Sequence, residues 1–418
     1  MSLLSAPSLP PGGDTSEWQL ALRQAPAAGR KMLRLLRQMR HGHLELRTPH
    51  GLTLRFGAPH APGALQARLD VHDWRVAAAT LRRGDIGFAE GYLDGLWSTP
   101  DLAALLRVML ANRREFDAAI YGHWAGRWLY RLRHRLRRNS RAGSRRNIHA
   151  HYDLGNGFYR LWLDDTMTYS AAWFDGDFSQ TLEQAQRAKM RRALQQAGVS
   201  EGTRLLDIGC GWGALAEMAA REFGARVVGV TLSSQQLAYG LSRLAHAGLC
   251  ARAELRLQDY RDIADGPYDA IVSIEMIEAV GQAYWPTYFG TLQRLLRPGG
   301  RACIQAIVIR DELFQRYLRG TDFIQQYVFP GGCLLSRGEI RRQAARAGLR
   351  VREELAFGPD YAETLRRWRR AFLAQRDAVR AQGFDERFVR LWTFYLAYCE
   401  AGFDAGDIDV VQVTLERP

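Results

Sequence analysis

LLDIGCGWG, which spans Leu205–Gly213, is the stretch that decides the fold of this chain. An apolar strand runs into an acid and then into three glycines at alternate positions, and a helix begins near Ala214. The glycines Gly209, Gly211 and Gly213 let the backbone turn sharply and approach a ligand, while the helix N-terminus directs N–H groups toward negative charge. The loop therefore predicts a ligand site at the end of a buried strand.

Strands alternate with helices from Thr203 onward. Apolar runs of strand length occur in TRLLDIG, ARVVGVTL, ELRLQDY, YDAIVSIEM and RACIQAIVI, and segments with helical spacing separate them. Such a βαβ series forms a parallel sheet. Near the end of the chain, LRVREELAFG and DIDVVQVTLER are two more strand patterns on either side of a helical, aromatic-rich insertion. We therefore predict an α/β fold with a doubly wound sheet that is closed by an antiparallel hairpin.

The glycine loop fits two classes of ligand. A dinucleotide site has an acid about twenty residues later, at the end of the second strand, where this chain has VGVTLSSQQ. The acid just before the first glycine instead suits a zwitterionic amino-acid ligand such as S-adenosylmethionine. The purely structural alternative is a tight turn that only packs the strand against the helix, and the polar residues at the strand ends argue against it. The residues predicted to hold the cofactor at the strand ends are Asp207, Gly209, Gly211, Gly213, Thr231, Ser233, Gln236, Asp259 and Tyr260.

The composition limits the classes of protein to which this chain can belong. The 418 residues are 47% hydrophobic, enough for two or three domains, and the formal net charge of +13 favours an anionic partner, either nucleic acid or membrane headgroups. The five cysteines are scattered without a CxxC pair, so we expect neither a disulfide framework nor a metal site, and a reducing cytoplasm fits. The N-terminus does not resemble a signal peptide and no long apolar run follows, so we expect a protein that does not span a membrane.

Shifts in composition divide the chain into four segments. A Pro/Gly/Ser-rich stretch at 1–15 reads as a disordered tail, and 16–120 as a small α+β accessory domain that contacts lipid. In that domain Arg30–Arg40 predicts an amphipathic helix, HLELRTPHGLTLRFG predicts a hairpin, and helices and turns follow. Residues 121–147 predict a basic amphipathic helix and linker, for which a membrane-surface role, simple packing on the domain and nucleic-acid binding all stay open. The remainder, 148–418, is the predicted catalytic domain.

Several motifs outside the glycine loop give the chain a family resemblance. They are HYDLGNGFYRLWLD, MTYSAAWF, VVGVTLSSQQ, LQDYRD, SIEMIEAVG, FIQQYVFPGGCLLS, FGPDYAETL and FYLAYCEAGF, with GDIGFAEGYLDGLW nearer the N-terminus. Through them the chain resembles the cyclopropane fatty acid synthase family of S-adenosylmethionine-dependent methyltransferases, which includes the mycolic acid cyclopropane synthases. The resemblance implies a class I, Rossmann-like methyltransferase fold. It also implies a substrate, the double bond of an unsaturated acyl chain, usually in a membrane phospholipid, which becomes a cyclopropane.

The resemblance assigns residues as well. It implies that Tyr169 and Ser170 lie against the cofactor, and that Glu278 and Tyr361 line a reaction centre where family members bind bicarbonate as the base. Those members carry a cysteine and a histidine where this chain has Ala171 and Gln305, which makes bicarbonate doubtful here.

The proton acceptor can therefore be sought in the protein itself. Glu275 stands where many relatives carry glycine, and it adds a carboxylate one helical turn from Glu278. Without ring closure, a hydride shift would give a methylene- or methyl-branched chain. A third hypothesis is a lipid-binding relative that has lost its chemistry.

Each candidate also has a structural interpretation. Glu275 and Glu278 could cap a helix start, and Tyr361 could be a core aromatic residue with a satisfied hydroxyl. Cys399 matches a cysteine proposed as catalytic in the family, but methylating an alkene needs no thiol, and LWTFYLAYC reads as a buried helix. His151 either orders a lid or caps a helix.

The predicted partner is an anionic membrane phospholipid at the inner face of the membrane, to which a cytoplasmic protein binds peripherally. A nucleic-acid methyltransferase would explain the charge equally well, but no NPPY-type signature or RNA-binding motif is present, so we expect no nucleic acid. The assembly state is open, with a homodimer as one candidate.

Overall fold

The structure is a computed structural model that describes residues 15–57, 63–120 and 154–418. The chain divides into two compact units, residues 1–126 and 127–418, and each is described here by itself. The tail up to residue 14, the basic segment at 121–147 and His151 lie outside the described residues. The roles proposed for them, and the domain boundaries, stay predictions.

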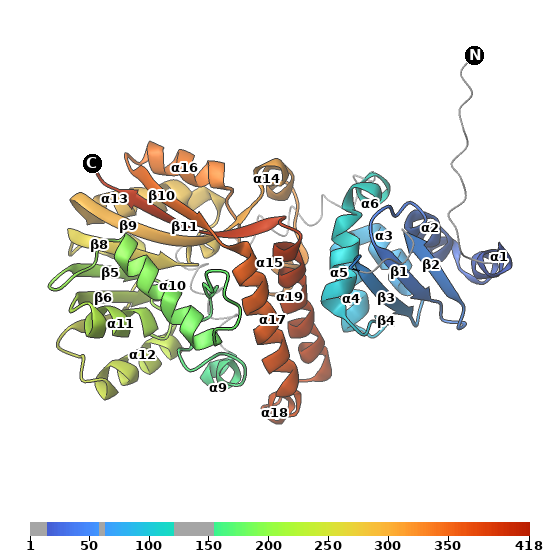
Figure 1. Cartoon of the computed structure of the whole chain (residues 1–418), viewed down its shortest axis with the longest axis horizontal. Coiled ribbons are helices and arrows are strands. Elements are labelled where there is room, and N and C mark those ends of the chain that lie inside the picture. Colours follow the sequence, from blue (N-terminus) through green and yellow to red (C-terminus); the bar gives the residue numbers. More distant parts are fainter. Residues whose placement is uncertain (1–14, 58–62, 121–153) are drawn as a thin grey trace, which may run out of the picture. The chain divides into compact units, whose positions relative to one another are not determined.

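The first unit is built on a four-stranded sheet with the order β2-β1-β3-β4 (Figure 1). The hairpin prediction is confirmed, because β1 (His43–Arg47) pairs antiparallel with β2 (Thr53–Gly57). The expectation of only helices and turns after it was wrong, because β3 (Gln66–Val71) pairs parallel with β1, and β4 (Trp97–Ser98) pairs with β3. These strands gave little signal because QARLDV buries only two side chains and β4 has two residues.

Helices complete the first unit. They are α1 (Thr15–Gln24), α2 (Ala27–Leu36), α3 (Arg75–Arg83), α4 (Asp85–Leu93), α5 (Leu102–Ala111) and α6 (Arg113–Ile120). In and just after α2, the predicted apolar stripe of Met32, Leu33, Leu36 and Met39 is buried. The amphipathic helix expected here is confirmed.

The second unit contains a seven-stranded sheet with the order β10-β11-β9-β8-β5-β6-β7. Its strands are β5 (Arg204–Ile208), β6 (Arg226–Thr231), β7 (Ala253–Leu257), β8 (Tyr268–Ile274), β9 (Leu296–Ile309), β10 (Arg350–Ala356) and β11 (Ile408–Glu416). The neighbouring pairs from β9 to β7 are parallel, and β11 runs antiparallel to both β9 and β10. This confirms the predicted parallel sheet with an antiparallel closing hairpin.

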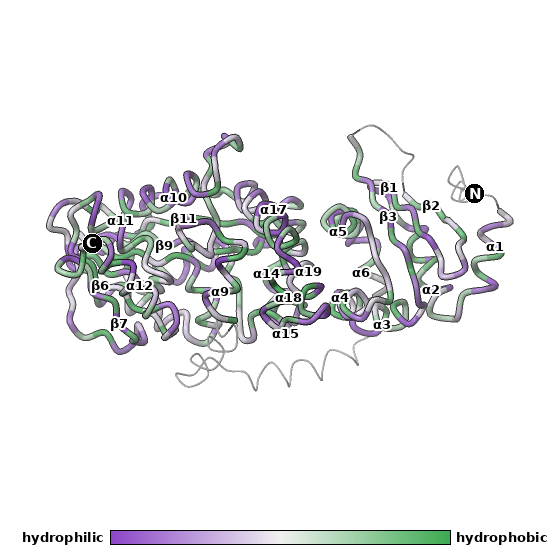
Figure 2. The backbone as a smooth tube through the Cα atoms, turned by 90° about the horizontal axis from the view of Figure 1, so that it is seen from below, coloured by the Kyte–Doolittle hydropathy of each residue, from purple (hydrophilic) through white to green (hydrophobic). Residues whose placement is uncertain are grey.

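Helices cover both faces of this sheet (Figure 1). Successive residues of β5 face opposite ways: Leu205 packs with side chains of α10 and α11, and Leu206 packs in a second core with side chains of α13 and α16. Hydrophilic and hydrophobic residues alternate along α10 and α17 in Figure 2, as expected for helices with one buried face. The helices around the sheet are α9 (Gly155–Arg160), α10 (Leu182–Gln196), α11 (Ala214–Glu222), α12 (Ser234–His246), α13 (Trp285–Leu295), α14 (Asp311–Leu318), α15 (Phe323–Tyr327) and α16 (Arg337–Arg346), with short 3-10 turns η1 (Tyr260–Asp262), η2 (Ile277–Ala279) and η3 (Gln282–Tyr284).

The insertion between β10 and β11 forms α17 (Gly358–Ala374), α18 (Arg376–Ala381) and α19 (Glu386–Asp404). The two long helices, α17 and α19, pack side by side. Their buried side chains include several large aromatic residues, as the sequence predicted. In the part of the chain that the structure describes, no helix is both long enough and apolar enough to cross a membrane.

Candidate active site

A pocket lies where β5, β6, β7 and β8 end. Because the carboxyl ends of parallel strands meet at one edge of a sheet, the loops after these strands converge there. The predicted cofactor residues that line it are Tyr169, Ser170, Asp207, Gly209, Gly211, Thr231, Gln236, Asp259 and Tyr260. Two others lie outside the lining: Gly213 precedes α11, and Ser233 caps α12 by accepting a hydrogen bond from the Gln236 N–H.

The three glycines of the loop have different neighbours. All have a positive φ, a backbone region that favours glycine. A side chain at Gly209 would meet Met276, and one at Gly213 would approach Gly240 of α12, whereas one at Gly211 would meet nothing within 4 Å. Gly211 therefore opens onto the pocket, and Gly213 allows α11 and α12 to pack closely.

A cation and a carboxyl group face the same pocket. Lys189 of α10 is fully buried, and its Nζ donates to Ser170 Oγ over 2.5 Å. Burial lowers the pKa of Lys189 to about 8, against the opposing charges of Glu275, Asp164 and Asp207. Burial raises the pKa of Asp207 to about 7, and its Oδ2 accepts no hydrogen bond from the described residues.

This arrangement fits a zwitterionic ligand. A buried polar atom without a partner is costly, so Asp207 Oδ2 is suited to accept from a ligand ammonium group. The Lys189 ammonium and the N–H groups at the start of α11 are suited to a carboxylate. The pocket thus matches the amino-acid end of S-adenosylmethionine, as the acid before the glycines predicted.

Polar side chains at the next two strand ends are held by local contacts. Thr231 Oγ1 donates to Gln236 Oε1 over 2.9 Å, and Asp259 pairs with Arg261 at 2.5 Å. Tyr260 is buried beside them, and burial raises the pKa of its phenol to about 12. These groups are therefore preorganised at the strand ends that were predicted to hold the cofactor.

Three donors from other parts of the chain bond to the Glu275 carboxylate. Its Oε1 accepts from the Ala171 N–H at 2.8 Å and from Gln305 Nε2 at 2.7 Å, and its Oε2 accepts from the Tyr361 hydroxyl at 2.6 Å. Burial raises the pKa of Glu275, and the Lys189 ammonium opposes that rise most strongly. Donors from three separate segments therefore converge on one carboxylate in the pocket wall.

The backbone at Glu275 corrects one expectation. Glu275 and Glu278 do not share a helical turn, because Glu275 has φ 48° directly after β8 and η2 begins only at Ile277. A left-handed conformation costs a residue with a Cβ about 1–2 kcal/mol. The polar contacts of its side chain hold Glu275 in this strained position.

Glu278 has fewer partners than Glu275. Its Oε1 accepts from the Ile307 N–H at 2.5 Å, and its Oε2 has no hydrogen bond among the described residues. Burial raises the pKa of Glu278 to about 8, and the charge of Glu275 adds to the rise. The two carboxyls therefore differ in their surroundings: three donors favour the anion at Glu275, whereas Glu278 has one donor and a raised pKa that favours its protonated form.

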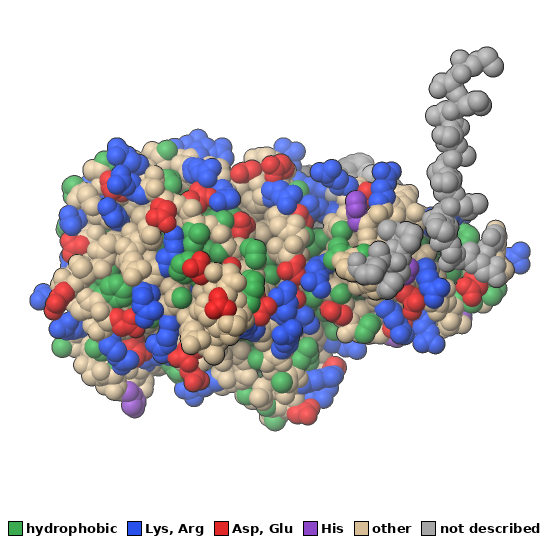
Figure 3. Space-filling model, in the orientation of Figure 1, with side chains coloured by type: hydrophobic (Ala, Val, Ile, Leu, Met, Phe, Trp, Pro, Cys, Tyr) green, Lys and Arg blue, Asp and Glu red, His purple; other side chains and the backbone are tan. Residues whose placement is uncertain are grey.

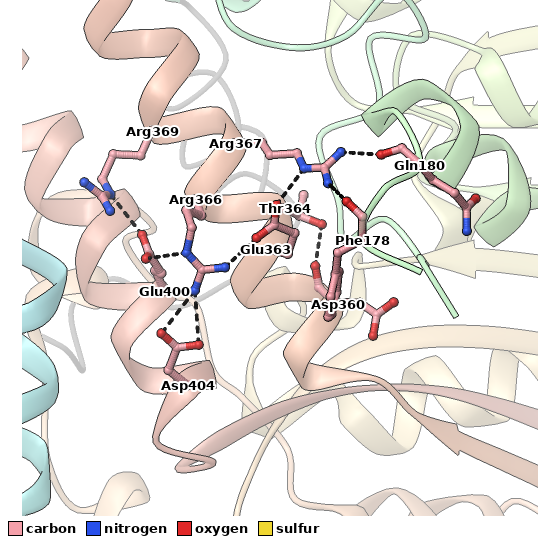
Figure 4. A network of polar contacts seen from close by, with 10 residues as sticks. All are labelled: Phe178, Gln180, Asp360, Glu363, Thr364, Arg366, Arg367, Arg369, Glu400 and Asp404. Carbon is pink, nitrogen blue, oxygen red and sulfur yellow. Dashed lines mark hydrogen bonds and ion pairs between the residues drawn. The ribbon is translucent and has the colours of Figure 1, made fainter. Parts of the chain in front are cut away.

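A polar network fixes the helix that carries Tyr361. Figure 4 shows Arg366 of α17 reaching Glu400 and Asp404 of α19, while Arg369 meets the other side of Glu400. Arg367 donates to backbone carbonyls of the loop that precedes α10. Because Glu400 is buried but paired with two arginines, α17 is held firmly and its tyrosine is positioned with it.

Aromatic rings form a wall next to Glu275. The Tyr361 ring lies 4.5 Å from that of Phe403, and the Tyr169 ring lies 5.4 Å from that of Trp368. Tyr169 and Tyr395 share a hydrogen bond of 2.7 Å. Cys399 of α19 is a free thiol whose pKa is raised by burial, and it is not among the residues that line the pocket. This placement supports the structural interpretation of Cys399.

The sequence profile of the mycolic acid cyclopropane synthetase family matches residues 139–413, well over half of the chain. The chain belongs to this family. It is therefore an S-adenosylmethionine-dependent methyltransferase, as the motifs predicted.

Two relatives of this family member match most of its length. The tuberculostearic acid methyltransferase UfaA1 of Mycobacterium tuberculosis is 42% identical over 384 residues, covering 90% of this chain and 88% of the relative. The cyclopropane-fatty-acyl-phospholipid synthase of Escherichia coli is 35% identical over 338 residues, covering 81% and 84%. The similarity to both therefore extends into the N-terminal part of the chain.

Solved structures of the family agree in fold. The mycolic acid cyclopropane synthase CmaA1, complexed with SAH and CTAB, has a TM-score of 0.61 at 34% identity and covers 65% of this chain and 97% of its own. The cyclopropane synthase MmaA2 from Mycobacterium tuberculosis has a TM-score of 0.61 at 32% identity, with the same coverage. The cyclopropane synthetase family member described here has the class I methyltransferase fold, and S-adenosylmethionine is its cofactor.

Sequence reasoning overlooked α10 and the lysine on it. The helix has a capping box, Thr181 with Gln184, which is a readable start signal. Lys189 is one of only two lysines in a chain that otherwise uses arginine. A lysine keeps a compact charge whose pKa can shift on burial, unlike the guanidinium of arginine.

Proposed function

We propose that this chain transfers the methyl group of S-adenosylmethionine to the double bond of an unsaturated acyl chain in a membrane phospholipid and forms a cyclopropane. The observation that carries the proposal is the Glu275 carboxylate, which lies half-buried in the wall of the cofactor pocket and is held by three donors. The name and 35% identity of the Escherichia coli phospholipid synthase support the substrate class.

The chemistry of an alkene sets three demands on the site. Bound S-adenosylmethionine supplies a strongly electrophilic methyl group, which an alkene attacks only when the two are held close and in line. Addition leaves a carbocation on the acyl chain, which must be shielded from water. A base must then remove one proton so that the ring can close.

The residues around Glu275 meet these demands. The ring of Tyr169 lines the pocket and offers a π face that stabilises a cation without reacting with it. Trp368 packs against Tyr169, and Tyr361 packs against Trp368. Glu275 is the proposed proton acceptor, because its three donors and the charge of the Lys189 ammonium favour the anion. Tyr361 keeps its hydroxyl proton, since burial raises its pKa, and so it orients Glu275 as a donor.

Glu275 also accounts for the departures from the family pattern. Positions 171, 305 and 361 all contact its carboxylate, and the resemblance places these positions around bicarbonate in other members. We infer that the side chain of Glu275 takes the place of the bicarbonate ion that other members bind. Glu278 contributes a neutral carboxyl to the same region.

A methyl-branched product is the second candidate. The 42% identical relative is named a methyltransferase of tuberculostearic acid and not a cyclopropane synthase. The two products differ in when the proton leaves: fast removal closes the ring, and slower removal leaves time for a hydride shift. The position of Glu275 relative to the cation decides between them.

One experiment separates the candidates. The purified chain is incubated with unsaturated phospholipid vesicles and S-adenosylmethionine carrying a trideuterated methyl group, and the released fatty acids are analysed by gas chromatography with mass detection. A ring retains two deuterium atoms from the donor, and a branch formed by hydride shift and loss of a chain proton retains three. A methylene branch also retains two, and its retention time distinguishes it from the ring. No incorporation would leave the non-catalytic, lipid-binding alternative.

The membrane location is part of the proposal. The net charge of +13 favours anionic lipid. On the face of the second unit drawn in Figure 3, Lys and Arg side chains are interspersed with Asp and Glu. Attraction on that face is therefore spread out, and we expect weak, salt-sensitive binding to the lipid surface.

A further inference from the structure

Two glutamines lie opposite each other on neighbouring strands of the seven-stranded sheet. Gln305 of β9 pairs in register with Gln412 of β11, and each is only 1% exposed. Both strands are otherwise mostly apolar at their buried positions. Buried amides need partners for every donor and acceptor, so their contacts reveal what the pair does.

Hydrogen bonds join the two glutamines into a chain that ends at Glu275. Arg192 Nη1 donates to Gln412 Oε1 at 2.6 Å, and Gln412 Nε2 donates to Gln305 Oε1 at 3.0 Å. Gln305 Nε2 then donates to Glu275 Oε1 at 2.7 Å. At the outer end, Arg192 also pairs with Glu353 of β10. The series of hydrogen bonds thus runs from Arg192 on α10 through β11 and β9 to the carboxylate of Glu275.

Arg192 fixes the donor-to-acceptor direction of this series of hydrogen bonds. A guanidinium group can only donate hydrogen bonds, so the Gln412 oxygen must face Arg192. The amino group of Gln412 then faces the oxygen of Gln305, and it also donates to the Lys189 carbonyl at 3.3 Å. Gln305 consequently has its amino group, and not its oxygen, directed at Glu275.

We propose that Arg192 and Gln412 are positioning residues that fix the Gln305 amide as a hydrogen-bond donor to Glu275. The inference rests on the proposed role of Glu275 as the proton acceptor. It assigns a role in the reaction to two residues that do not themselves line the pocket.

This hydrogen-bonded series from Arg192 through Gln412 and Gln305, called the relay below, favours the anion of Glu275 and disfavours a proton on its Oε1. A protonated Glu275 could donate to Gln305 only if both amides turned over, which would direct the Gln412 amino group at the Arg192 guanidinium. Two donors would then face each other without an acceptor, which is unfavourable in a buried site. The charged groups that face Glu275 from other elements are Lys189 on α10 and Glu278 on η2, with Tyr361 on α17. The relay acts in addition to them.

A titration of Glu275 tests the inference directly. Infrared difference spectra of the full chain, recorded as a function of pH, follow the carboxyl band that is lost in Glu275→Gln. Arg192→Gln replaces the obligatory donor with a group that can also accept, so we expect the midpoint of the band to rise by about one pH unit. Arg192→Lys can again only donate, and it should restore the wild-type midpoint.

A matched control separates the relay from a general effect on packing. Thr414 is buried two residues from Gln412 on the same strand, and its hydroxyl is bonded to Gln196 of α10. Thr414→Val removes a polar group under the same helix without touching the relay, so its midpoint should equal the wild type. Equal shifts in Thr414→Val and Arg192→Gln, or an unchanged midpoint in Arg192→Gln, would overturn the inference. If Arg192→Gln does not fold, Gln412→Leu supplies the same comparison.

The titration needs no substrate, so it separates this inference from the proposed function. Methyl transfer to phospholipid is measured on the same variants over the same pH range. A shifted band together with a matching shift of the acidic limb of the rate supports both. A shifted band in a chain that transfers no methyl group supports the relay and refutes the proposed function.

Discussion

Glu275→Gly is the most informative substitution at this site. Glycine adopts φ 48° without the cost of about 1–2 kcal/mol that a Cβ incurs there. The same change leaves the Ala171 N–H, the Gln305 amide and the Tyr361 hydroxyl without their acceptor. An orphaned buried donor costs about 1–3 kcal/mol, so three outweigh the relief of strain and the variant should be less stable than the wild type.

Glu275→Gly should also strongly reduce the rate of methyl transfer. A well-placed general base contributes about a hundredfold or more to a rate, so in buffer free of carbon dioxide Glu275→Gly should transfer methyl groups at least about a hundred times more slowly. The vacated space is lined by donors, and a small carboxylate should bind there. Added formate or bicarbonate should therefore raise both the melting temperature and the rate of the variant.

The assay measures transfer of a labelled methyl group from S-adenosylmethionine to unsaturated phospholipid while the anion is titrated. Glu275→Gln is the control, because its side chain fills the same space and leaves no room for an anion, so neither formate nor bicarbonate should rescue it. The wild type should be insensitive to both anions. A wild-type rate that depends on bicarbonate, or a glycine variant with the full rate in its absence, would refute the reasoning.

Three further outcomes are expected. Gly211→Asn should weaken cofactor binding more than tenfold in calorimetry, whereas Gly248→Asn, at a similar positive φ with the same open surroundings, should not; equal affinities would contradict the pocket assignment. Folded Glu278 holds a proton that the unfolded chain releases, so calorimetric melting should show the wild type losing stability from about pH 4.5 to 8 relative to Glu278→Gln, and parallel curves would argue against the raised pKa. Co-sedimentation with anionic vesicles should decrease as salt rises, and equal binding to neutral vesicles would exclude an electrostatic contribution.

The sequence predicted the main sheet well because its signals are local. Most of the parallel strands are apolar runs, β7 alternates apolar and charged residues, and the Leu205–Gly213 loop indicates both the turn and the helix after it. The strand ends that line the pocket follow directly, since parallel strands place them at one edge. The short β3 and β4 lacked such runs and were missed.

The site was predictable only in part. Glu275, Gln305 and Tyr361 were each identified as candidates, but the convergence of the last two on the first depends on the placement of α17 and on a strained backbone, which no local pattern specifies. The link from Arg192 to Gln412 joins residues 220 positions apart. A glutamine in the apolar run VVQVTL was the one local signal for it.

The rarity of lysine in this chain makes the pocket open to chemical labelling. Acylating reagents attack neutral amines, and Lys31 is exposed whereas Lys189 is buried at the cofactor pocket. At pH 8 about half of the Lys189 amines are neutral, far more than for an ordinary lysine, so its labelling is limited by access and not by protonation. The ratio of the two labelled peptides in a mass spectrum therefore reports how often the pocket admits solvent, with Lys31 as an internal standard, and added cofactor should slow the labelling of Lys189 alone.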